Sequence, residues 1–338
     1  MWKTPMLLVM RVIFVTFRVV MVVGALCFSV ACTNGGSTRS SATAQDGYPA
    51  PFKEWQIIDT ATGQPVSLDQ WTALLFQQDI IYLGEEHHNR FHIDAAMMVL
   101  QKLKADGRTP ALAMEMFGWD GQAALDQYVS GLEISRQEFL VAVRWRQNWG
   151  GPFEDYEPLV RLAKEHHWTL DAMNPPKPLV RIVAKNGLAQ AESDPMMAQW
   201  GMKDEAIVDD PIYRARILEQ LQACHGKGDD SLYQTMLDAS MFRDEGMAKT
   251  VAGYLARQER PSTHGPLVSY TGGGHIQYYV PVPNRVRRRS HDVKQMTIYL
   301  TALSGDQRDE VMELLRSGIA DYIWLTPIGA HGPAKRCK

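Results

Sequence analysis

The sequence predicts an α/β protein, with a mainly parallel β-sheet flanked by helices and a smaller helical subdomain. Short, continuously apolar runs recur along the chain, as expected for strands that are covered on both faces. Helical patterns alternate with these runs, which is the order that β-α-β units produce. Polar residues follow several of the runs, at the strand ends where open parallel sheets bind ligands.

The composition is that of a globular protein, and its charge does not suggest nucleic-acid binding. The chain has 338 residues, of which 45% are hydrophobic and 22% are charged. Its net charge of −3 and its pI near 6.4 give no indication of nucleic-acid binding. We expect one α/β domain at 52–330 with helical elaborations.

Residues 1–32 have the pattern of a lipoprotein signal peptide. A run of thirteen uncharged, mostly apolar residues at 19–31 ends at Cys32. That run is short for a membrane span, which needs roughly 20 residues. Cys32 would be the acylated residue, although Ser29 stands where such signals usually carry Leu. Three basic residues precede the apolar run: Lys3, Arg11 and Arg18.

These features predict an exported protein that is held to a lipid bilayer through Cys32. The polar stretch 33–51 would then be a flexible tether. Cleavage without lipidation, or retention of the segment as an anchor, stays open. Cys224 and Cys337 could pair in an oxidising compartment, but their spacing does not decide it.

The elements follow in order along the chain. A helix at 89–107 follows the first strand, with Asn89 as its N-cap and Gly107 at its end. Two further stretches, 119–166 and 188–258, are predicted to form a helical layer over the sheet. The basic run 285–289 is predicted to be a solvated loop, with contact to carboxylates or lipid headgroups as the alternative. Six apolar runs are predicted strands: 79–85, 110–117, 168–174, 266–272, 295–303 and 320–326.

Acidic and histidine side chains at the strand ends predict one cleft. Glu85 and His87 are two residues apart at the end of a strand, so their side chains can point the same way. Glu115 lies near the end of the second strand, and His275 follows the fourth. A carboxylate beside an imidazole supports either acid–base chemistry or a divalent metal site. We expect His92 to border this cleft.

Glu86 and His88, the sequence neighbours of Glu85 and His87, are predicted to be more exposed than the cleft residues. Arg243 and Asp244 lie on a predicted helix, where an ordinary solvated ion pair is a real alternative to a site. Several aromatic residues in the first helical stretch could form core or line a pocket: Trp119, Tyr128, Trp145, Trp149, Phe153 and Tyr156.

An ordered set of motifs resembles the ChaN family of haem-binding lipoproteins. The motifs are LGEEHHNRFHIDA, AMEMF, MNPP, FRDEGMA and TGGGHIQYYVPVP, within roughly 52–330. The resemblance implies an α/β fold, an outer-membrane or periplasmic location in a Gram-negative bacterium, and a role in haem or iron acquisition. It also implies haem bound between two protomers through a tyrosine, and hence a homodimer when loaded.

The same resemblance suggests residues for two different roles. Candidates for contact with haem are Tyr128, the first choice for the iron ligand, then Tyr156, with His92 and Arg243. The family belongs to the Tiki and erythromycin esterase superfamily with its GExH motif, which maps onto Glu85 and His87. The alternative function is therefore a hydrolase, an esterase or metal-dependent peptidase, that uses Glu85, His87, Glu115 and His275 as catalytic residues.

Overall fold

The computed structural model describes residues 51–225, 230–257, 264–305 and 308–332. The predicted signal peptide and the predicted tether up to residue 50 lie outside them, as does Cys337. The described residues belong to one compact unit, Asp46–Lys338. No helix within the described ranges is both long and apolar enough to cross a bilayer.

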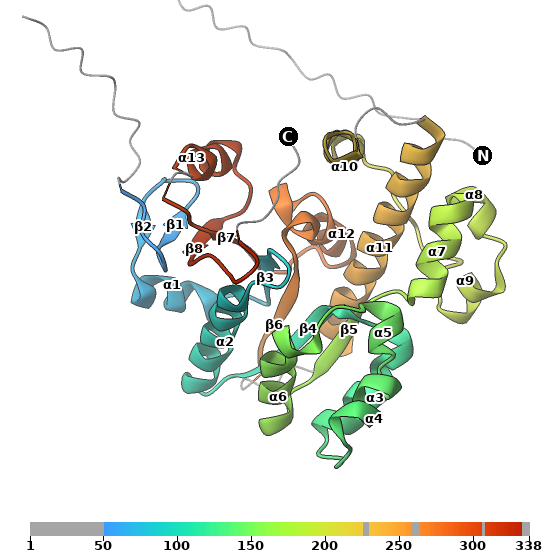
Figure 1. Cartoon of the computed structure of the whole chain (residues 1–338), viewed down its shortest axis with the longest axis horizontal. Helices are drawn as coiled ribbons and strands as arrows, with labels where there is room; N and C mark the ends of the chain where they lie inside the picture. Colours follow the sequence, from blue (N-terminus) through green and yellow to red (C-terminus); the bar gives the residue numbers. More distant parts are fainter. Residues whose placement is uncertain (1–50, 226–229, 258–263, 306–307, 333–338) are drawn as a thin grey trace, which may run out of the picture. The chain divides into compact units, whose positions relative to one another are not determined.

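An eight-stranded sheet with the order β2-β1-β8-β7-β3-β6-β4-β5 forms the centre of this unit (Figure 1). The strands from β8 to β5 are parallel, whereas β1 and β2 add an antiparallel edge. The strands are β1 Ile57–Asp59, β2 Pro65–Val66, β3 Ile80–Glu85, β4 Thr109–Gly118, β5 Leu170–Asn174, β6 His264–Gly272, β7 Gln295–Ala302 and β8 Tyr322–Thr326.

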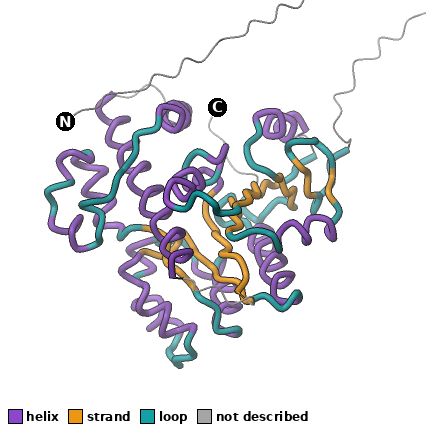
Figure 2. The backbone as a smooth tube through the Cα atoms, turned by 180° about the vertical axis from the view of Figure 1, so that it is seen from behind, coloured by secondary structure: helices purple, strands orange, loops and turns teal. Residues whose placement is uncertain are grey.

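Helices lie on both sides of the strands, as the view from behind shows (Figure 2). The longest described helix, α11, packs against β5 and β6 of the sheet and contacts α7, α8 and α10. The helices are α1 Leu68–Leu75, α2 Arg90–Ala105, α3 Gln122–Val129, α4 Arg136–Ala142, α5 Trp145–Asn148, α6 Glu157–Glu165, α7 Lys177–Asn186, α8 Leu188–Ala191, α9 Pro195–Gln199, α10 Pro211–His225, α11 Asp230–Arg257, α12 Val282–Arg289 and α13 Arg308–Ser317, with short 3₁₀ turns η1 Trp119–Gly121, η2 Phe153–Asp155, η3 Gly273–His275 and η4 Gln277–Tyr279.

The sheet is apolar on both faces, which explains the continuous apolar runs of the sequence. In β3, Ile81 and Leu83 pack in a core cluster with α1, α2, α3 and α6. The alternate residues Ile80 and Tyr82 pack on the other face with α11 and α12. A strand between two helical layers needs apolar residues at every position, because its successive side chains point to opposite faces.

The predicted α/β fold is confirmed, with six predicted strands in the parallel part of the sheet. Asn89 is the N-cap of α2, and its side chain accepts a hydrogen bond from the amide of Phe91. The short antiparallel strands β1 and β2 were not predicted. The prediction of a solvated loop at 285–289 is wrong, because these residues form the end of α12 and Arg285 is buried.

Gly84 lets β3 pass close to the turn that carries His275. A Cβ atom on Gly84 would lie 2.6 Å from Cδ1 of Ile276 and 2.9 Å from Cα of Gly273. The second contact is to backbone, which cannot move away as a flexible side chain can. The closeness of the two segments therefore depends on the missing side chain.

We expect Gly84→Ala to destabilise the protein by about 1–3 kcal/mol, the usual cost of overpacking a core. The measurement is urea unfolding followed by circular dichroism. Gly274→Ala is the matched control, because a Cβ atom there would have no neighbour within 4 Å. Equal stability of the two variants would show that β3 does not need the close approach.

Candidate functional site

The candidate site lies at the carboxyl ends of the parallel strands. Glu85 ends β3, Glu115 lies near the end of β4, and Asn174 ends β5. His275 follows β6 in the turn η3. The structure brings the predicted residues together in two acid–histidine pairs, Glu85 with His87 and Glu115 with His275.

The first pair is Glu85 with His87. The Glu85 side chain is fully buried, and its Oε1 lies 2.7 Å from Nδ1 of His87. Its carboxylate also accepts hydrogen bonds from the hydroxyls of Tyr270 at 2.6 Å and Tyr156 at 3.0 Å. Burial raises the pKa of Glu85 more than these hydrogen bonds lower it. Through its contact with Nδ1, Glu85 therefore orients the His87 imidazole so that Nε2 faces the cleft.

His87 presents its other nitrogen to the second pair. A Cβ atom on Gly272 would lie 3.0 Å from Nε2 of His87 and 3.5 Å from Oε2 of Glu115. Burial lowers the pKa of His87, but the hydrogen bond to Glu85 and the charges of Glu115 and Glu85 outweigh it, so the pKa is raised. The side chain keeps 41% of its surface exposed, which makes it the open side of the cleft.

The second pair is Glu115 with His275, and both are held by further charges. Oε1 of Glu115 lies 3.2 Å from Nε2 of His275 and 2.6 Å from Nη2 of Arg243. Oε2 accepts a 2.7 Å hydrogen bond from the amide of Gly272. Although burial alone would raise the pKa of Glu115, His275 and Arg243 hold it well below its usual range.

His275 lies between two carboxylates. Its Nδ1 is 2.5 Å from Oδ1 of Asp244, opposite the contact with Glu115. Burial lowers the pKa of His275, but the charges of Glu115 and Asp244 outweigh it and raise the pKa to about 9. His275 is therefore protonated and Glu115 is ionised at neutral pH. Asp244 in turn accepts a 2.6 Å hydrogen bond from the hydroxyl of Tyr213.

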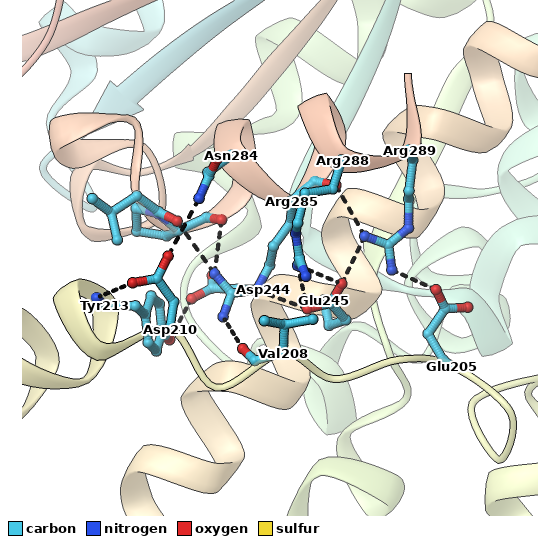
Figure 3. Close-up of polar contacts among 12 residues, drawn as sticks. Glu205, Val208, Asp210, Tyr213, Asp244, Glu245, Asn284, Arg285, Arg288 and Arg289 are labelled. Carbon is cyan, nitrogen blue, oxygen red and sulfur yellow. Dashed lines mark hydrogen bonds and ion pairs between the residues drawn. The ribbon is translucent and has the colours of Figure 1, made fainter. Parts of the chain in front are cut away.

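A charge network on the outer side of Asp244 connects the site to α12 (Figure 3). The guanidinium of Arg285 lies 4.2 Å from the centre of the Tyr213 ring. Nε of Arg285 is 2.9 Å from the buried carboxylate of Glu245, which follows Asp244 on α11. Arg288 and Arg289 contact the same carboxylate. The basic run thus fixes α12 against α11 and supports the residue that holds His275.

Two of these residues were missed in the sequence. Tyr213 and Tyr270 give no polar signal, since each is an aromatic residue in a helix or an apolar strand. The solvated ion pair that was the alternative for Arg243 and Asp244 is not formed. Asp244 is 2% exposed and contacts His275, whereas Arg243 contacts Glu115. The motif FRDEGMA is therefore the sequence signal for both residues.

The other histidines of the opening motif have structural contacts. His92 is fully buried, and its Nδ1 accepts a 2.9 Å hydrogen bond from the amide of Glu86. Burial lowers its pKa to about 3, so it stays neutral. His92 thus supports the β3–α2 loop from inside, and it has no exposed surface to border the cleft. The prediction that His88 is more exposed than the cleft residues is wrong for the comparison with His87. The His88 side chain is 30% exposed and that of His87 is 41% exposed. Nδ1 of His88 lies 2.6 Å from Oδ2 of Asp155.

Glu86 is more exposed than Glu85 but less exposed than His87, so the prediction for its exposure is only partly met. Glu86 is half-buried and accepts a 2.9 Å hydrogen bond from the hydroxyl of Thr301.

The two candidate tyrosines differ in burial. Tyr156 is fully buried against Glu85, and burial raises its pKa. Tyr128 is partly exposed on α3. Among the described residues, no group of three or more histidine, cysteine, aspartate or glutamate side chains is placed to hold a metal ion.

Comparison with known proteins identifies the family. Residues 71–286 match the model of a family described as haem-binding uptake, Tiki superfamily, ChaN. No match to the chain was found among curated protein sequences. The structure of ChaN of Campylobacter jejuni, described as binding haem cofacially, has 18% sequence identity and a TM-score of 0.61. That likeness covers 80% of this chain and 96% of the other.

Two other solved structures are more distant. A protein from Bacillus cereus has 13% identity and a TM-score of 0.39, over 70% of each chain. An erythromycin esterase mutant in its open conformation has 13% identity and a TM-score of 0.40, over 74% of this chain and 77% of that chain. The family match extends from α1 to α12 and so includes every residue of the two acid–histidine pairs. The chain therefore belongs to the ChaN family of haem-binding uptake proteins in the Tiki superfamily.

Proposed function

We propose that this protein is an exported haem-binding lipoprotein that acts in haem or iron acquisition. The family match over residues 71–286 is the observation that carries this proposal. The Cys32 pattern of the sequence supports export and attachment to a bilayer. The cofacial haem described for ChaN of Campylobacter jejuni supports binding of haem between two copies of the chain.

Tyr128 fits the role of iron ligand better than the other candidates. Its ring packs on Phe139, with 4.3 Å between ring centroids, and Nζ of Lys164 lies 4.2 Å from the ring centre. Within the described residues its hydroxyl has no hydrogen bond, so the oxygen is available to a ligand. Burial and the charge of Glu157 raise the pKa of Tyr128, so ferric iron would have to displace the phenolic proton.

The surroundings of Tyr128 also suit a flat apolar ligand. Leu132, in the turn after α3, keeps 45% of its surface exposed. Tyr156 and His92 are fully buried, so neither reaches a ligand at the surface without a change in the structure. We therefore keep Tyr128 as the first candidate and Tyr156 as the second.

We expect hemin to give a saturable shift of the Soret band with the wild-type protein. Tyr128→Phe should weaken hemin binding about tenfold or more, because it removes the phenolate oxygen but keeps the ring. Tyr156→Phe is the control and should bind hemin as the wild type does. Light scattering should show a dimer only after loading. A shift unchanged when both tyrosines are replaced would refute tyrosine ligation.

Lipidation makes a separate prediction. Cells that express the wild type and are fed an alkyne fatty acid should yield a labelled protein, whereas Cys32→Ser should stay unlabelled. Cys27→Ser is the control within the same segment and should be labelled normally. Label on the Cys32→Ser protein would place the lipid elsewhere or exclude this signal.

A hydrolase is the second candidate function, because the two acid–histidine pairs have the groups that water chemistry needs. His87, oriented through Nδ1 by Glu85, could take a proton from water at Nε2. Protonated His275 and Arg243 could stabilise the negative charge that develops on an attacked carbonyl. These residues are catalytic candidates in this proposal only.

If the cleft hydrolyses esters or peptides, His87→Ala should lower the rate by roughly 10² to 10⁴. His291→Ala, an exposed histidine, is the control. The rate should fall as the pH rises through about 9, where His275 loses its proton. Asp244→Asn should move that fall to lower pH, because it removes one of the two charges that raise the pKa. Activity that persists in His87→Ala and His275→Ala would eliminate this mechanism.

A further inference from the structure

A small pocket opens beside Arg243, the residue that is paired with Glu115. Its volume is about 120 Å³, and its walls include Asn148, Trp149, Asn174, Lys177 and Arg243. These residues come from the end of α5, the end of β5, the start of α7 and the middle of α11. Ligand pockets for drug-sized molecules are about 300–1,000 Å³. This pocket therefore suits one functional group and is too small for a macrocycle.

The pocket contains two cationic side chains that are incompletely neutralised. Arg243 uses Nη2 on Glu115 and Nε on Asn174, at 2.6 Å and 3.3 Å. Its Nη1 has no partner among the described residues. Lys177 lines the pocket but is also exposed to solvent, and its Nζ has neither an ion pair nor a hydrogen bond within the described part of the chain. Burial and the charges of Arg243 and Arg181 lower the pKa of Lys177.

The nearby acids are already engaged. Glu115 is shared between Arg243, His275 and the amide of Gly272. Asp120 accepts hydrogen bonds from Asn148 at 2.9 Å and Gln147 at 3.0 Å, and it lies 3.6 Å from Arg144. Positive charge therefore exceeds negative charge in the pocket, and an oxyanion would supply the missing partner.

We propose that this pocket is an anion subsite, which binds the carboxylate or phosphate group of a small ligand. Arg243 and Lys177 hold the oxyanion. Trp149 forms the wall between the pocket and His87, since its ring centroid lies 4.9 Å from that of His87. The rest of such a ligand extends past Trp149 to Nε2 of His87. This inference does not depend on haem binding, because Tyr128 is not among the residues that line the pocket.

The test is calorimetric titration of the protein with acetate and with inorganic phosphate, at low ionic strength. We expect at least one of the two to bind at a single site, and the stronger of them identifies the anion. Acetamide, the neutral analogue of acetate, should not bind. Lys177→Gln should weaken the anion about tenfold, the usual effect of losing one charge-assisted hydrogen bond. Lys177→Arg should keep most of the affinity.

Lys185→Gln is the matched control, because Lys185 is also exposed but lies at the other end of the same helix, α7, and does not line the pocket. It should bind the anion as the wild type does. Bound anion should also shift the indole N–H signal of Trp149 in an NMR spectrum, assigned through Trp149→Phe. The proposal is overturned if neither anion binds, if acetamide binds equally well, or if Lys177→Gln and Lys185→Gln have the same affinity. Hemin titration of Lys177→Gln should be normal, which separates this test from that of haem binding.

Discussion

The buried carboxylate of Glu115 is the constraint on which the site depends. An ionised carboxylate away from water is very costly unless it is paired and hydrogen-bonded. Here the carboxylate is paired by His275 and Arg243 and accepts the amide hydrogen of Gly272. One charge on β4 thereby holds the end of β6, the turn η3 and the helix α11 in fixed positions. Losing a single partner of such a group typically costs about 3–5 kcal/mol.

Buried charges further from the strand ends are compensated in the same way, each by a neighbouring group. Protonated His275 needs Asp244, and Asp244 is held by Tyr213. The ring of Tyr213 lies under Arg285, and Arg285 is paired with buried Glu245. Each buried charge is thus compensated by the next layer, from the strand ends to α12. The arrangement of helices α10 to α12 therefore affects the protonation of His275.

The haem proposal and the cleft concern different parts of the fold. Tyr128 lies among helices α3, α4 and α6, with Phe139 and Lys164 as its contacts. Glu85, His87, Glu115 and His275 lie at the strand ends. If Tyr128 is the iron ligand, haem binding requires no chemistry from the acid–histidine pairs, and a ligand in the cleft requires nothing from Tyr128. The family match spans both regions.

The sequence by itself determined the fold class, the six parallel strands and the polar ends that converge. Apolar continuity and helix caps act over a few residues, so they can be recognised without a structure. The pair Glu85 and His87 was predictable for the same reason, since strand geometry links residues two apart. Glu115 and His275 required one further rule, that the carboxyl ends of parallel strands share one edge.

Only the tertiary structure decided which charges are buried and which partner each one has. The sequence predicts a solvated loop for Arg285, because a basic run carries no sign of the buried carboxylate of Glu245 on another helix. The sequence predicts His92 beside a ligand, because its place on a helix does not show that its Nδ1 accepts the loop amide of Glu86. Tyr213 and Tyr270 gave no polar signal, yet their hydroxyls hold Asp244 and Glu85. Such contacts join residues far apart in the chain, and the energy of a buried charge depends on all its neighbours at once.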